Sequence, residues 1–175
     1  MGLFSKEKIT IDQLTENHVN LIFRSISDDS LEVYKMLLKN MNENEVIDKR
    51  QKREILVLEM LATTRVIQKV FTDVKESKIL LDKLYAKIYD KFSESEKEQS
   101  EFEEFVNERY KVYYKILTSD SMFSLGIGKQ FADYFLNKDV TSLAFINAIT
   151  DIFISNIKLG QEFLEGLLSK YKLEK

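Results

Sequence analysis

The chain holds few residues that could do chemistry together. It has 175 residues with one histidine, His18, and no cysteine. Thiolate zinc sites, iron–sulfur clusters, disulfides and cysteine nucleophiles are therefore excluded. One histidine cannot build a His-rich zinc site, and a di-iron bundle would need two Glu-x-x-His motifs, which the sequence lacks. His18 falls on the apolar side of its predicted helix, so we expect a buried histidine and no catalytic base.

A short glycine segment, Gly126-Ile127-Gly128-Lys129, invites comparison with phosphate-binding loops. A Walker A loop needs a glycine where Phe123 stands and a serine or threonine where Gln130 stands. The dinucleotide-binding fingerprint needs a glycine in place of Phe131. We expect no nucleotide here. The glycines instead indicate close helix packing, a break in the helix or a hinge.

The charged residues are balanced in number, and their clusters have ordinary explanations. The formal net charge is −3, from 26 basic and 29 acidic residues, so no nucleic-acid partner is expected. Glu101, Glu104 and Glu108 share a helix face, but no second carboxylate helix accompanies them. The basic run 49–53 could bind phosphate, but acidic neighbours predict a solvated helix face extending beyond the core. We expect no metal, no cofactor and no enzymatic activity.

Aromatic residues give the sequence its main candidate site. Six of the eight tyrosines lie between residues 85 and 134. A tyrosine ring with its hydroxyl suits the wall of a groove, although an ordinary aromatic core explains the same pattern. Arg65 and Arg109 lie among apolar residues, so we expect carboxylate or aromatic partners for both. The candidate groove for a ligand or a partner is lined by Tyr85, Tyr89, Arg109, Tyr110, Tyr113, Phe131 and Tyr134.

The elements that must position these residues are helices. The chain contains no proline and only five glycines, which predicts long helices joined by short polar connections and no sheet. We expect one all-α domain over residues 1–175, a bundle of six or seven helices whose first eight residues are disordered. Two long helices, about 45–75 and 141–171, should lie at its centre. Residues 55–58 are apolar on every side, which predicts that they are surrounded.

The last predicted helix has more apolar surface than docking on its own bundle requires. Its apolar residues recur in steps of three and four, with a second apolar flank beside them. About 30 residues of helix span about 45 Å, so the helix should extend past the body of the domain. An extended apolar face favours a homodimer. The predicted dimer face consists of Phe153, Phe163, Leu164 and Leu167.

Two classes of function remain open from the sequence. The first is a non-catalytic interaction or adaptor protein that binds a protein partner or a second copy of itself. The second is a helical bundle that binds a small apolar molecule, as a sensor or carrier, in an aromatic-lined pocket. The absence of cysteine and of an apolar leader favours the cytoplasm. The apolar stretch 140–157 contains Asp151, so we expect no membrane span.

Overall fold

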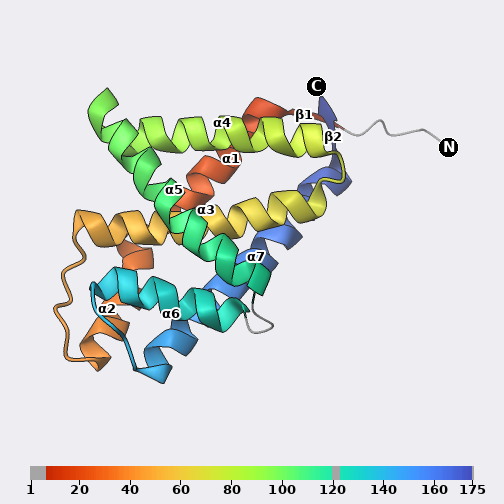
Figure 1. The fold of residues 1–175 in the computed structure, drawn as a ribbon. Helices are drawn as coiled ribbons and strands as arrows, with labels where there is room; N and C mark the ends of the chain where they lie inside the picture. Colours follow the sequence, from red (N-terminus) through yellow and green to blue (C-terminus); the bar gives the residue numbers. More distant parts are fainter. Residues whose placement is uncertain (1–6, 120–122, 175) are drawn as a thin grey trace.

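The computed structural model describes residues 7–119 and 123–174, which form one helical bundle with the order shown in Figure 1. Within these residues 81% of the chain is helical, which confirms the all-α prediction. The elements are β1 (Glu7–Thr10), α1 (Ile11–Arg24), α2 (Asp28–Asn40), α3 (Lys49–Val70), α4 (Val74–Phe92), α5 (Glu96–Ser119), α6 (Phe123–Leu136), α7 (Leu143–Lys170) and β2 (Tyr171–Glu174).

A small sheet departs from the expected absence of strands. β1 and β2 pair in parallel, with Glu7 opposite Tyr171 and Thr10 opposite Glu174. Glu7 and Lys8, which were expected to lack regular structure, begin this sheet, and Lys8 donates to the Glu174 carboxylate at 2.7 Å. Each strand has only four residues, so no period of alternation marks it in the sequence. The backbone partners of each strand come from the opposite end of the described chain, so a local sequence pattern cannot predict the pairing.

α3 lies at the centre of the bundle, as its sequence predicts. Ile55, Leu56, Val57 and Leu58 are fully buried, and α3 contacts α1, α4, α5, α6 and α7. The packing of α3 against α7 is also confirmed. α3 is shorter than the predicted helix 45–75, since it has 22 residues, fewer than the 24 of α5. A capping box at Asp48 starts α3 later than the predicted residue 45.

Asparagines end two of the helices. Asn42 follows α2 with a φ of 56°, and Asn137 follows α6 with a φ of 52°. This left-handed backbone is the conformation in which glycine commonly terminates a helix, and asparagine tolerates it better than most residues. The chain can therefore form tight helix ends while containing few glycines.

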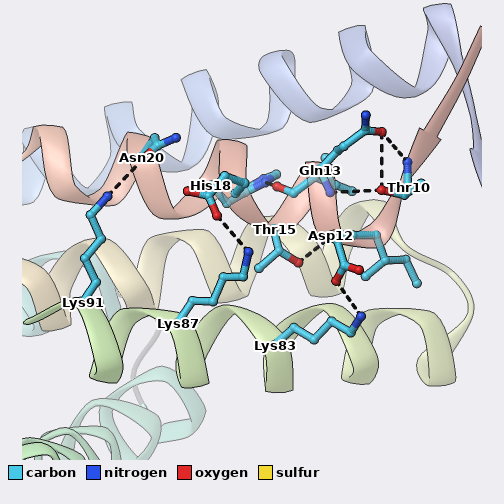
Figure 2. A network of polar contacts seen from close by, with 12 residues as sticks. Thr10, Asp12, Gln13, Thr15, His18, Asn20, Lys83, Lys87 and Lys91 are labelled. Atoms are coloured by element: carbon cyan, nitrogen blue, oxygen red, sulfur yellow. Dashed lines mark hydrogen bonds and ion pairs between the residues drawn. The ribbon is translucent and has the colours of Figure 1, made fainter.

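Figure 2 shows a regular ladder of polar contacts between α1 and α4. Lys83 donates to Asp12 at 2.6 Å, and Lys87 donates to Glu16 at 2.8 Å. Lys91 donates to the amide oxygen of Asn20 one turn further along. The steps of four residues in both helices show that α1 and α4 run in parallel. The ladder fixes the orientation of α1, whose opposite side contributes to the pocket described below.

The sequence predicts that the basic run at the start of α3 extends into solvent. In the structure this run instead contacts other helices. Arg50 donates to the backbone oxygens of Tyr134 and Phe135, so it caps the C-terminal end of α6. Lys49 and Arg53 both pair with Glu98 of α5. Burial of α3 at its N-terminal end explains the difference, because neighbouring helices supply acceptors for this run. The run is therefore a structural junction between helices.

Candidate functional site

The structure does not bring the predicted aromatic groove together as one surface. Tyr113 and Phe131 are fully buried in the core, and their rings fill space between helices. Tyr134 packs edge-on to Tyr113, with ring centroids 6.3 Å apart. The predicted residues therefore divide among the core, an ion-pair cluster and a surface hollow. Their shared spacing along helices reflects packing on several sides of α5 and α6.

Arg109 has both kinds of partner that the sequence predicts. Its Nε and Nη2 donate to the fully buried Glu54 carboxylate at 2.8 to 3.1 Å, and its guanidinium lies 3.8 Å from the centroid of Tyr134. Burial raises the pKa of Glu54, and the hydrogen bonds and charge of Arg109 offset only part of that effect. This arrangement joins α3 to α5. Arg65, for which the same partners were expected, is instead exposed on α3.

Three of the predicted tyrosines line a shallow hollow of about 360 Å³ between α4 and α5. They are Tyr85, Tyr89 and Tyr110. The hydroxyl of Tyr85 lies 2.5 Å from Thr64 Oγ1 and donates to Tyr110 Oη at 3.2 Å. The Tyr85 and Tyr110 hydroxyls therefore already have partners in the protein, and the other polar side chains of the hollow include Gln99, Glu103 and Asn107.

The predicted dimer face is also divided. Phe153 and Leu164 are fully buried within the bundle, so they are not available to a second copy. Leu167 is partly buried against the core, and Phe163 is exposed at 37%. The reason is that α7 lies on α3 and α6 along the side that the sequence assigned to the dimer. The exposed large apolar residues of α7 are Leu143, Ile154, Leu159 and Phe163.

A different pocket, about 310 Å³ in volume, opens between α1, α3 and α7. Its walls are mainly apolar, and the polar side chains of His18, Glu59, Thr63 and Asn156 interrupt them. The pocket is lined by His18, Leu21, Ile22, Glu59, Thr63, Val66, Asn156, Leu159, Gly160 and Phe163. An apolar hollow with a few convergent polar groups is the usual form of a small-molecule site.

His18, which lines this pocket, has one ring nitrogen without a hydrogen-bond partner among the described residues. The side chain is buried, and its Nδ1 lies 2.8 Å from the backbone oxygen of Leu14. A carbonyl oxygen only accepts hydrogen bonds, so Nδ1 carries the proton and Nε2 is the acceptor of the neutral ring. Burial lowers the pKa of His18, which favours this neutral form. Nε2 is buried and has no hydrogen-bond partner in the part of the chain that the structure describes.

Glu59 is the second unusual group in the pocket. It extends from α3, and its Oε1 accepts a hydrogen bond from Nδ2 of Asn156 on α7. Burial raises the pKa of Glu59 to about 7. An ordinary glutamate is fully ionised at neutral pH, whereas this carboxyl group is poised between its two forms. A ligand that stabilised one form would therefore shift the protonation of Glu59.

Glycine brings α7 close to α3 at the wall of the pocket. A Cβ placed on Gly160 would lie 3.2 Å from Cγ2 of Val66, tighter than ordinary van der Waals contact. Beyond Glu59 and Asn156 the pocket adjoins a second hollow of about 380 Å³, which includes Tyr34. Both hollows share Leu21, Glu59 and Asn156, so a groove continues along α7 between α1 and α2.

The sequence pattern did not predict this pocket, although it did predict that His18 is buried. One signal was available: Glu59 interrupts the most apolar part of the central helix, where a carboxylate is unexpected. Asn156 gives the same signal in the last helix. The pairing of these two residues depends on the packing of α3 against α7, which the periodicity of neither helix determines.

Two further observations bear on the classes of function. Over the described residues no cluster of three or more His, Cys, Asp or Glu side chains could hold a metal ion. By length and composition alone α7 could cross a membrane, with a mean hydropathy of 1.3 and 22% of that stretch buried. Core helices of soluble proteins meet the same criterion, so the expected absence of a span stays a prediction.

Comparisons with protein families, with curated proteins and with solved structures gave no match for this chain.

Proposed function

We propose that this protein is a non-catalytic binding protein, a sensor or carrier, whose ligand is a small amphipathic molecule held in the pocket between α1, α3 and α7. The observation that carries the proposal is a mainly apolar pocket lined by Glu59, Asn156 and His18, whose buried Nε2 has no partner among the described residues. A buried polar atom without a partner costs about 1 to 3 kcal/mol, and a ligand donor would remove that cost.

The apolar walls and the polar groups have separate roles in this proposal. Leu21, Val66, Leu159 and Phe163 would cover the apolar body of a ligand and supply most of the affinity. His18, Glu59 and Asn156 would orient its polar end and supply specificity. No activated nucleophile accompanies them, since Thr63 is the one hydroxyl side chain among the described residues lining the pocket. The geometry therefore supports binding better than catalysis.

The pocket can be tested with small probes that share a phenylethyl body and differ at the polar end. We expect at least one to cause saturable shifts in the methyl resonances of Val66 and Leu159. Leu21→Trp should abolish the shifts, because Leu21 is 41% exposed at the rim and an indole there would occupy the pocket. Ile79→Trp on α4 is the matched control, since Ile79 is similarly exposed but lies outside the pocket.

The outcomes separate the possibilities. Binding that Leu21→Trp abolishes and Ile79→Trp leaves intact supports the proposal. Equal binding by both variants places the ligand elsewhere and overturns it. An absence of saturable shifts for every probe, together with native mass spectra of freshly purified protein that show no added mass, also overturns it.

A second candidate function is self-association as an interaction protein. The observation that favours it is the exposure of apolar residues along α7, with Leu143 exposed at 69% and Ile154 at 46%. These two residues are eleven positions apart, close to three helical turns, so they share one side of α7. A second copy could cover that side, which differs from the dimer face predicted from the sequence.

Sedimentation equilibrium tests this second candidate. We expect the wild type to be a dimer and the Leu143→Glu, Ile154→Glu double variant to be a monomer, because each glutamate would place a charge in the apolar contact. The control is Val46→Glu with Val74→Glu, two exposed valines that are not part of α7. A monomeric wild type, or an unchanged dimer in the α7 variant, excludes association through this side.

A further inference from the structure

Most of the polar atoms that stay free in the pocket, once the internal bonds are counted, are hydrogen-bond acceptors. His18 Nδ1–H is used by Leu14, which leaves Nε2 as an acceptor. Asn156 Nδ2 donates to Glu59 Oε1, which leaves Asn156 Oδ1 and Glu59 Oε2. Both remaining oxygens accept hydrogen bonds when Glu59 is ionised. A complementary ligand must therefore bring several donors on one small group.

The charged residues of the pocket also favour a ligand that carries hydrogen-bond donors. No lysine or arginine is among the described residues that line it, and Glu59 is its one acidic group. A carboxylate or phosphate ligand would meet no cation, and only the second N–H of Asn156 and the Thr63 hydroxyl could donate to it. An ammonium group carries three donors and a positive charge, and the Phe163 ring at the pocket wall favours a nearby cation.

Building on the proposed function, we propose that the ligand is a small apolar amine bound as its ammonium ion, with Glu59 as its counter-ion and His18 Nε2 and Asn156 Oδ1 as further acceptors. The apolar body of the amine lies against Leu159, Val66 and Phe163. Arg24 lines the second hollow and is exposed on α1.

Binding of this ligand is coupled to a proton. In the empty pocket, burial holds the pKa of Glu59 at about 7, so part of the protein carries the neutral acid at neutral pH. The ammonium ion arrives with its proton, Glu59 ionises, and the proton of Glu59 leaves to solvent. The other titratable or charged groups along the two hollows are His18 and Arg24 from α1 and Tyr34 from α2. From α7 the neighbour is the uncharged Asn156.

The test is titration calorimetry of the intact protein with phenethylamine, 2-phenylethanol and phenylacetate, which are cationic, neutral and anionic. We expect the amine to bind at least tenfold more tightly than the alcohol at pH 8. Its affinity should fall about five- to tenfold between pH 7.5 and pH 6, with proton release measured in buffers of different ionisation enthalpy. Glu59→Gln should remove the preference for the amine and its pH dependence.

The matched control is Glu162→Gln, which removes an exposed carboxylate of α7 outside the pocket and should leave the amine affinity unchanged. Equal amine binding by Glu59→Gln and the wild type overturns the assignment. Tighter binding of the alcohol or of phenylacetate than of the amine overturns it too, while leaving the small-molecule pocket in place. If none of the three probes binds, both the assignment of an amine ligand and the proposal of a small-molecule pocket are overturned.

If Glu59→Gln unfolds, the pH dependence and proton release of the wild type decide the assignment. Amine binding that releases no proton and does not change between pH 7.5 and pH 6 overturns it.

Discussion

Gly128 of α6 and Thr150 of α7 lie so close that a Cβ on Gly128 would fall 2.1 Å from Thr150 Oγ1. The same Cβ would lie 2.8 Å from the backbone oxygen of Ile146. Real Cβ atoms do not approach other atoms this closely, so any side chain at Gly128 must push the two helices apart. Of the roles that the sequence left open for this glycine, the structure shows close helix packing.

Gly128→Ala should therefore destabilise the protein by about 1 to 3 kcal/mol, because the backbone of α7 cannot yield as a flexible side chain would. Gly166→Ala is the control, since a Cβ there meets nothing within 4 Å. Alanine is a better helix former than glycine, so the control should gain up to about 1 kcal/mol. Urea melts of both variants measure the difference. If Gly128→Ala proves as stable as Gly166→Ala, α6 and α7 are not packed as described.

Glu59→Gln should change how stability depends on pH. Burial raises the folded pKa of Glu59 from 4.5 to about 7. The folded protein then holds a proton that the unfolded chain has lost between these values, so the wild type loses stability as pH rises from 4.5 to 7. Glutamine cannot ionise. We expect the variant to be more stable than the wild type at pH 8 by about 1 to 3 kcal/mol.

Urea melts at pH 5 and pH 8 measure this effect, and the difference between Glu59→Gln and wild type should nearly vanish at pH 5. Glu162→Gln, exposed on α7, should follow the wild type at both values. A stability difference that is equal at pH 5 and pH 8 contradicts a raised pKa for Glu59.

Arg109→Met should be among the most destabilising single changes, at about 3 to 5 kcal/mol. The reason is that Glu54 is fully buried and would lose the guanidinium that forms its ion pair. Arg65→Met is a matched control, because Arg65 is exposed on α3, and its effect should stay within about 0.5 kcal/mol. Thermal melts of the two variants should differ clearly. Equal melting temperatures would contradict the prediction that the buried Glu54 carboxylate depends on its ion pair with Arg109.

Glu98→Ala should lower stability in a manner that depends on pH. The side chain bonds Lys49 and the backbone N–H of Glu94, which lower the pKa of Glu98 to about 2. Its contribution is therefore present above about pH 4.5 and is lost as pH falls toward 2. The melting temperatures of wild type and variant should converge on acidification. Glu104→Ala, exposed on the same helix, should match the wild type throughout, and parallel curves for Glu98→Ala would contradict the ion pairs.

The all-α fold could be predicted because it depends on local signals. The absence of proline, the capping box at Thr10 and the fully apolar turn 55–58 each report on a helix without reference to the rest of the chain. The position of α3 at the centre of the bundle could be predicted from the same turn, because that turn is apolar on every side. The start of the central helix was less accurate, since it is set by the side-chain cap of Asp48.

The candidate site could not be predicted because its residues meet only through packing. His18, Glu59 and Asn156 come from three helices that are far apart in the sequence. Periodicity shows which side of a helix is apolar, but not which neighbour covers it. Tyr113 and Phe153 illustrate the same limit, because each was assigned to a surface and each is buried beneath an adjacent helix.

The parallel pairing of β1 with β2 has a consequence for how the protein is made. The pocket needs α1, which leaves the ribosome early, and α7, which leaves late, and the sheet that joins their flanks forms later still. A nascent chain can bury α3 against its near neighbours, yet it has no wall opposite His18 until α7 emerges. A chain that ends before α7 therefore lacks one wall of this pocket, and α7 does not cover His18 and Glu59 in it.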